Sequence, residues 1–245
     1  MLTQYDLDRY DRQMMIPGWG EAGQEKLKKA KVFIAGAGGL GCPLSLYLAV
    51  AGIGTIRIVD LDVVALSNLN RQVLHWDEDI NRDKIVSARE KLTRVNPSIK
   101  IEAIKETITD DNILKLAGDC DVIVDAMDNI ATRYTLNRAA FEMKRPFFHG
   151  AIYGFEGRAM TVVPGKSACL ACLYRGIPQR KKFPVLGTVP ALIAMIQATE
   201  VIKYITGVGE LLTDRILIYD GFSMKFMEIS IKKDPECTVC GKGVK

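Results

Sequence analysis

A glycine-rich turn between an apolar run and an apolar helical segment constrains this chain most. Residues 36–41 read Gly-Ala-Gly-Gly-Leu-Gly and fit the pattern G-x-G-x-x-G. Residues 32–35 are continuously apolar, as in a parallel strand covered on both faces, and residues 41–51 are predicted to be a helix. The first glycine permits the turn, the second lets the backbone approach a phosphate, and the last lets the helix pack on its strand. The candidate nucleotide-contacting glycines are Gly36, Gly38, Gly39 and Gly41.

A carboxylate follows at the end of the next predicted strand, residues 55–60. Asp60 lies 19 residues after Gly41, where a carboxylate can accept hydrogen bonds from ribose hydroxyls. The N-terminus of the helix after the glycine turn offers free N–H groups to an anion. These features predict an adenine nucleotide, but they do not by themselves choose between NAD and ATP.

Strands and helices alternate as far as residue 148, which predicts a doubly wound, mostly parallel α/β sheet of the Rossmann-like class. After residue 148 the pattern changes to short strands, which we expect to extend the same sheet in antiparallel fashion. We therefore expect a single domain over 1–245, with a nucleotide-binding half (1–148) and a half with antiparallel strands and a zinc-binding lobe (149–245). The predicted helices are 5–29 with a break at Pro17-Gly18, 81–95, 110–117, 131–144 and 188–206, and the further strands are 98–104, 121–127, 158–163, 215–220 and 224–231.

The composition is that of a soluble globular protein. Apolar residues make up 48% and charged residues 25% of the 245 residues. The net charge of +4 gives no argument for nucleic acid. Residues 32–56 carry no charge and are long enough to span a bilayer, but six glycines and Pro43 interrupt them. The first residues are charged and lack the apolar core of a secretory signal, so we expect a cytoplasmic protein without a membrane partner.

Polar and charged residues gather after Asp60, where an oxidoreductase would not need them. Two arginines, one lysine and a carboxylate suit phosphoryl or nucleotidyl transfer, in which catalysis is mostly positioning and charge neutralisation. A carboxylate at the end of the fourth buried strand would suit Mg²⁺. For any one cation the alternative is a solvated surface charge, but this alternative explains the whole set poorly. The candidates are Arg12, Asp62, Asn68, Arg71, Gln72, Lys84 and Asp128.

These motifs together resemble the MoeB/ThiF family, prokaryotic relatives of the ubiquitin-activating enzymes. The resemblance covers nearly the whole chain, and it rests on RYDRQ (9–13), GAGGLG (36–41), DLDVVALSNLNRQ (60–72), NRDK (81–84), DAMDN (125–129) and two Cys-x-x-Cys pairs. It implies an ATP-dependent adenylyltransferase that activates the C-terminal glycine carboxylate of a small β-grasp, ubiquitin-like sulfur carrier of the MoaD or ThiS type, releasing pyrophosphate.

The resemblance also implies roles for individual residues. Asp60 would bind the ribose, and Asp128 would hold Mg²⁺. Arg12 would reach across a homodimer into the neighbouring site. Asn68, Arg71 and Lys84 would contact the triphosphate. His75 and His149, the only histidines, are expected to be structural, because nothing around them forms a catalytic triad.

Four of the six cysteines form two Cys-x-x-Cys pairs, Cys169 with Cys172 and Cys237 with Cys240. Four thiolates make a closed tetrahedral site for a structural Zn²⁺. Two redox pairs or reduced thiols are the alternative. The resemblance also implies zinc. Cys42 and Cys120 are expected to be buried apolar side chains.

The chain departs from the family in one segment. Many relatives carry a further cysteine in the loop after the first zinc pair, whereas residues 173–187 contain none. We therefore expect no covalent transfer step on this loop and a separate sulfur donor. The loop is basic instead, with Arg175, Arg180, Lys181 and Lys182, and it could guide an acidic partner tail or be merely solvated.

Three other functions stay open on the sequence. One is adenylation of a different peptide or ubiquitin-like substrate. The second is an NAD-dependent oxidoreductase, which the glycine turn alone would support. The third is a non-catalytic partner subunit that keeps the fold as a scaffold.

Overall fold

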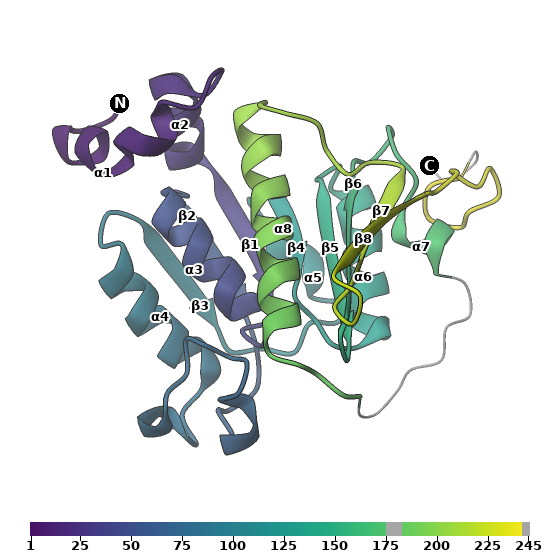
Figure 1. The fold of residues 1–245 in the computed structure, drawn as a ribbon, viewed down its shortest axis with the longest axis horizontal. Helices are drawn as coiled ribbons and strands as arrows, with labels where there is room; N and C mark the ends of the chain where they lie inside the picture. The colour runs from purple at the N-terminus through teal and green to yellow at the C-terminus, as the bar shows by residue number, and fades with distance from the viewer. Residues whose placement is uncertain (175–182, 242–245) are drawn as a thin grey trace.

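One eight-stranded sheet organises the chain (Figure 1), which the computed structural model describes over residues 1–174 and 183–241. Its strand order is β3-β2-β1-β4-β5-β6-β7-β8. The first five strands in this order are parallel, and β6, β7 and β8 continue the sheet in antiparallel pairing. The strands are β1 (Lys31–Ala35), β2 (Thr55–Val59), β3 (Lys100–Ile104), β4 (Val122–Asp125), β5 (Phe147–Tyr153), β6 (Glu156–Val162), β7 (Arg215–Asp220) and β8 (Lys225–Ser230). The predicted Rossmann-like sheet with an antiparallel extension is confirmed.

Strand β1 shows why the parallel half is built from continuously apolar runs. Val32 and Ile34 pack into the core on one face, and Phe33 and Ala35 pack into the core on the other. Successive side chains of a strand point to opposite faces, so a strand covered on both faces needs apolar residues throughout.

Helices cover both faces of the sheet. In Figure 1, α8 runs across the front beside α3, and α6 lies behind the strands. The front face carries α2 (Gly20–Lys29), α3 (Gly41–Ala51), α4 (Lys84–Val95) and α8 (Thr188–Thr206), with α1 (Gln4–Met14) packed on α2. The other face carries α5 (Ile113–Ala117), α6 (Ile130–Glu142) and α7 (Leu170–Leu173). The connection from β2 to α4 contains two 3₁₀ turns, Leu66–Asn68 and Asp77–Asp79.

Helix α8 is the one helix within residues 1–174 and 183–241 that is long and apolar enough to cross a membrane by length and composition. Its apolar side packs against α3, β5 and β6 as part of the main core. Core helices of globular domains commonly have this composition. The packing agrees with the buried helix that the sequence predicts over 188–206.

The main element that the sequence analysis missed is β5. The sequence pattern predicts that the alternation ends at residue 148, but the strand continues to Tyr153 between β4 and β6. His149 and Gly150 interrupt its apolar pattern. His149 is fully buried and is accommodated because its Nδ1 lies 2.7 Å from a carboxylate oxygen of Asp125 on β4. Polar partners on a neighbouring strand are invisible to a pattern read along one strand.

Candidate active site

A cavity of about 420 Å³ lies at the carboxyl ends of the parallel strands. Open α/β sheets bind ligands at this edge. Most of the predicted site residues line the cavity, although they come from five separate stretches of chain. They are Gly36, Gly38, Gly39, Asp60, Asp62, Arg71, Gln72, Lys84 and Asp128.

The glycine turn joins β1 to α3 by a very close approach of backbone to backbone. Gly36 has a φ of +104°, and its N–H donates to the Val59 carbonyl at 2.8 Å. Gly41 does not line the cavity. A Cβ added to it would lie 1.9 Å from the Gly36 carbonyl oxygen. Gly41 therefore has a packing role outside the cavity, because it lets α3 begin in direct contact with the glycine turn.

The Gly41→Ala variant is expected to lose at least about 3 kcal/mol of unfolding free energy, because the added methyl group must displace backbone. Urea denaturation measures this loss. Gly38→Ala is the matched control, since its added Cβ would meet Gln72 Nε2 at an ordinary 3.6 Å. Equal denaturation midpoints for the two variants would contradict this account of the turn.

Asp60 is held in place by two backbone groups. Its Oδ2 accepts from the N–H of Ala37 in the glycine turn, and its Oδ1 accepts from the N–H of Asp62, both at 2.8 Å. The carboxylate is therefore fixed at the mouth of the turn, where a sugar hydroxyl of a nucleotide could reach it.

Two cationic side chains face the cavity from the β2–α4 connection and the start of α4. Lys84 is buried, and its Nζ lies 2.8 Å from a carboxylate oxygen of Asp62, which is itself 69% exposed. Arg71 donates from Nη1 to the Ser67 carbonyl and to Asn70 Oδ1, both at 2.8 Å. Hydrogen bonds and the ion pair with Asp62 thus hold both cations in position, and an incoming anion could replace these partners. This arrangement suits a site that receives an anion.

Two further lining residues have polar groups available to a ligand. Gln72 is buried, yet its Oε1 has no hydrogen-bond partner within the described ranges. Buried polar groups are normally paired, so this amide is a candidate for ligand contact. Asp128 follows β4, is exposed to the cavity, and shows neither a hydrogen bond nor an ion pair within the same ranges. A free carboxylate beside a phosphate site fits Mg²⁺.

Besides Gly41, two predicted site residues do not line the cavity, Asn68 and Arg12. Asn68 uses its Oδ1 to accept from the Ala65 N–H at 3.0 Å, and its carbonyl accepts from the Arg71 N–H. In this state Asn68 closes the 3₁₀ turn that precedes Arg71. Arg12 lies exposed on α1, and Gln13 beside it donates to the Ala51 carbonyl at the far end of α3.

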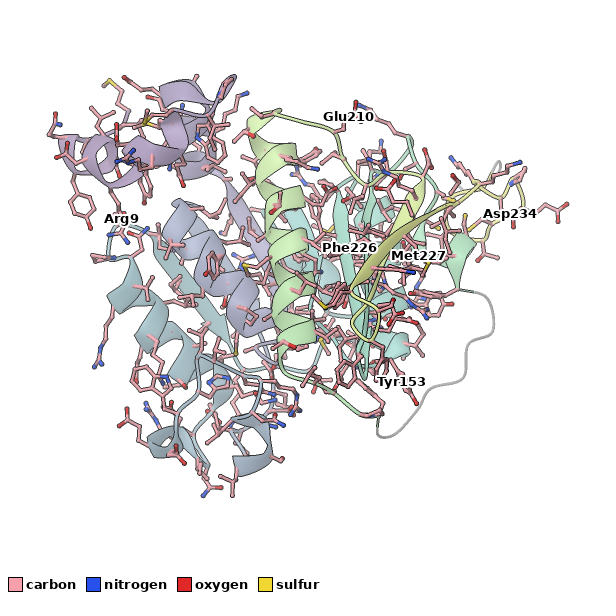
Figure 2. The ribbon with its side chains drawn as sticks, viewed as in Figure 1. Arg9, Tyr153, Glu210, Phe226, Met227 and Asp234 are labelled. Atoms are coloured by element: carbon pink, nitrogen blue, oxygen red, sulfur yellow. The ribbon has the colours of Figure 1, made fainter. Side chains whose placement is uncertain are left out.

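The length of α3 separates Arg12 from the cavity of its own chain. The helix has 11 residues, and it begins at the glycine turn. At ~1.5 Å per residue it spans about 16 Å. Figure 2 shows Arg9, on the same helix as Arg12, far from Tyr153, which neighbours the lining residue Ile152.

Sequence reasoning missed a buried polar network beneath the cavity. Arg133, on α6, lines the cavity, and its Nε lies 3.3 Å from Asp125. Its Nη2 donates to the carbonyls of Met127 and Gly150. Burial lowers the pKa of His149 below its ordinary value although Asp125 opposes this, so the neutral ring donates from Nδ1 to that carboxylate. The DAMDN motif contains Asp125, but nothing along the sequence indicates its partners.

The four cysteines of the two Cys-x-x-Cys pairs meet at α7, where Cys169 immediately precedes the helix and Cys172 lies within it. Their sulfur atoms all lie within 4.8 Å of one another, and none is in a disulfide. The closest separations are 3.4 Å for Cys172 with Cys240, and 3.6 Å for Cys169 with Cys237. Four sulfurs at ~2.3 Å from a tetrahedral Zn²⁺ would lie about 3.8 Å apart, so the cluster fits the ion.

The polar surroundings of the cluster also suit a thiolate site. The Asp234 N–H points at Cys172 Sγ, at 3.5 Å. Burial raises the pKa of Cys237, but backbone N–H groups of Val239 and Cys240 outweigh burial and lower that pKa to about 7. Burial raises the pKa of Cys169 to about 11 and also raises the pKa of Cys240, so without a metal Cys237 is the most readily deprotonated of the three, and the others would release their protons on binding the ion.

Removing zinc is expected to lower the free energy of unfolding by at least about 2 kcal/mol, because the ion would tie the C-terminal tail to α7. Metal analysis of purified protein should find one zinc per chain. Cys237→Ser should lose it, whereas Cys120→Ala, with a buried thiol outside the cluster, should keep it. Zinc content unaffected by Cys237→Ser would contradict the assignment.

The basic run that the sequence analysis singled out, Arg175, Arg180, Lys181 and Lys182, lies outside the described residues.

The chain is similar to known proteins along almost its whole length. It is 38% identical to the sulfur carrier protein adenylyltransferase of Thermus thermophilus, over 98% of this chain and 92% of that protein. It is 40% identical to the SAMP-activating enzyme E1 of Haloferax volcanii, over 99% of this chain and 92% of that protein. Among solved structures, E. coli MccB with ATP has a TM-score of 0.86 and 27% identity, covering 98% of this chain and 76% of that one.

The family follows from these similarities and from the cavity. Residues 10–239 match the ThiF family. The chain therefore belongs to the ThiF family, within the MoeB/ThiF group of ATP-dependent adenylyltransferases.

Proposed function

We propose that this enzyme uses ATP to adenylate the C-terminal glycine carboxylate of a small β-grasp, ubiquitin-like sulfur carrier of the MoaD or ThiS type. The observation that carries the proposal is the placement of Arg71 and Lys84 in one cavity with the glycine turn and Asp60. Two relatives whose names specify a sulfur carrier and a SAMP as their substrates support the choice of substrate class.

The chemistry needs charge neutralisation more than proton transfer. A glycine carboxylate is already ionised at pH 7, so its attack on the α-phosphorus requires no general base. A carboxylate oxygen forms the new bond to phosphorus, the bond to the bridging β-phosphate oxygen breaks, and pyrophosphate leaves with that oxygen. The obstacle is the repulsion between two anions, which fixed cations lower while they align the attack.

The proposed roles follow from position. Asp60 binds the ribose, and the N–H groups of the glycine turn receive phosphate oxygens. Arg71 and Lys84 neutralise the triphosphate. Asn68 contacts it once the 3₁₀ turn adjusts, and Asp62 gives up Lys84 to the incoming phosphate.

Asp128 would hold Mg²⁺, with the nucleotide phosphates as further ligands. The ion, when bound, would neutralise charge on the phosphates. The Cys₄ cluster would hold Zn²⁺, which has a closed coordination shell and a structural role.

We further propose that the chain functions as one domain in a cytoplasmic homodimer, with Arg12 completing the neighbour's site. No cysteine is present in residues 173–187, so the acyl-adenylate would pass to a separate sulfur donor.

ATP–pyrophosphate exchange with a purified glycine-tailed β-grasp protein tests the proposal. Exchange should appear only when the carrier ends in an intact glycine, and removal of that residue should abolish it. Nicotinamide cofactor turnover without exchange would contradict the proposal and favour the oxidoreductase. Binding of the carrier without exchange would favour a scaffold subunit.

A further inference from the structure

We propose that His75 is a positioning residue that aims the Gly38 N–H at the nucleotide phosphates by holding the Ala37 carbonyl. The inference rests on the proposed nucleotide site. His75 does not line the cavity and would touch neither substrate.

Hydrogen bonds hold the residue Ala37 at both its carbonyl and its N–H. His75 is buried, and its Nε2 lies 3.0 Å from the Ala37 carbonyl oxygen. The Cys42 thiol donates to the same oxygen at 3.2 Å, and burial raises the pKa of that thiol to about 12, so it keeps its proton. On the other side, the Ala37 N–H donates to Asp60.

Because of peptide geometry, holding the Ala37 carbonyl also sets the direction of the Gly38 N–H. The Ala37 carbonyl and the Gly38 N–H belong to one planar trans peptide group, in which they point in opposite directions. A carbonyl fixed toward the buried ring therefore directs the Gly38 N–H away from it, and Gly38 lines the cavity. Rotation of this peptide depends on ψ of Ala37 and φ of Gly38, and the wide φ freedom of glycine at position 38 leaves the peptide poorly fixed unless its carbonyl is held.

The hydrogen bonds around the ring define one tautomer. A carbonyl oxygen can only accept, so Nε2 carries the proton. Nδ1 then accepts from the Ser87 hydroxyl at 2.9 Å. The Ser87 oxygen in turn accepts from Lys91 Nζ at 2.9 Å, and Lys91 pairs with Asp79.

These hydrogen bonds join His75, in the β2–α4 connection, to the glycine turn on one side and to Ser87 on α4 on the other. The same connection carries Arg71 and Gln72, which line the cavity. The buried His75 ring thereby fixes the position of the N–H groups of the glycine turn relative to the side chains of Arg71 and Gln72. A purely structural histidine would stabilise the fold without favouring phosphate over the rest of the nucleotide.

Two substitutions separate these possibilities. His75→Gln can place an amide N–H where Nε2 stands, whereas His75→Asn reaches only the position of Nδ1. Affinities for ATP and for adenosine are measured on the intact protein. Asparagine is expected to weaken ATP binding about tenfold and to leave adenosine binding unchanged, because adenosine has no phosphates. Glutamine is expected to restore ATP binding to within about twofold of wild type.

The outcomes separate this inference from the proposed function. If the wild-type protein binds ATP and the asparagine variant binds it equally well, the positioning role is wrong. Equal losses of ATP and adenosine affinity would also overturn it, since they indicate general damage to the site. A wild-type protein that binds neither ligand would overturn the proposed function itself.

Nitrogen NMR of ¹⁵N-histidine protein gives an independent readout. The chain has only two histidines, so the His75→Gln variant assigns the spectrum. The expected signature of His75 is a neutral ring with a protonated Nε2 and a bare Nδ1. A proton on Nδ1 of the neutral ring, or a charged ring at pH 7, would overturn the proposal.

Discussion

Lys84→Ala and Arg71→Ala are each expected to slow ATP–pyrophosphate exchange by at least about a hundredfold, the loss typical of removing one preorganised charge from a developing anion. Both side chains line the cavity next to the glycine turn. The proposed reaction brings a carboxylate against a triphosphate, so each missing cation leaves repulsion that the remaining charges of the site offset only in part.

The lysine substitution should not unfold the protein. Its partner Asp62 is 69% exposed, so loss of Lys84 leaves no buried unpaired charge. Lys100→Ala is the matched control. This lysine pairs with Glu102 on β3, is 70% exposed and does not line the cavity. Exchange rates and thermal midpoints are measured together. A Lys84 variant that folds and exchanges at the wild-type rate would rule out the proposed chemistry.

The predicted residues that the structure brings into one cavity lie in short stretches of chain. The glycine turn can be recognised from its own residues between an apolar run and a helix, and Asp60 can be recognised from its place at the end of the next predicted strand. Parallel strands bring their carboxyl ends to one edge, so the topology places Asp128, which follows β4, near that turn. Lys84 begins α4 and lines the same cavity beside Asp62.

The parts that the sequence did not predict depend on contacts between distant segments. His149 is 24 residues from Asp125, and no spacing rule links them. His75 meets the Ala37 carbonyl across 38 residues. Both histidines were expected to be structural, and both are buried. Only the folded structure shows that one reaches the network beneath the cavity and the other reaches the glycine turn.

For Arg12 the sequence and the fold differ in the other direction. The sequence groups Arg12 with the site residues, but the fold places it far from the cavity of its own chain. It lies on α1, at the end of α3 that is remote from the glycine turn. Within one chain it cannot act on a nucleotide in the cavity. A role in catalysis therefore requires a second copy of the chain, and this requirement can be tested by mixing inactive subunits.

Arg12→Ala and Lys84→Ala are each expected to be inactive as homodimers and active as a mixed dimer. In the mixed dimer, one site combines the intact lysine of the first chain with the intact arginine of the second. The other site lacks both. Two-fold symmetry therefore predicts about half of the wild-type exchange rate per dimer.

Co-expression with two different affinity tags allows the mixed dimer to be purified and assayed for exchange. The Arg12→Ala homodimer should keep its dimer mass, which shows that the substitution removes chemistry and not assembly. If Arg12 acted within its own chain, both sites of the mixed dimer would lack one essential residue, and no activity would return. Recovery of activity from two inactive proteins would place Arg12 in the neighbouring site, because no other arrangement of these two residues restores a complete set.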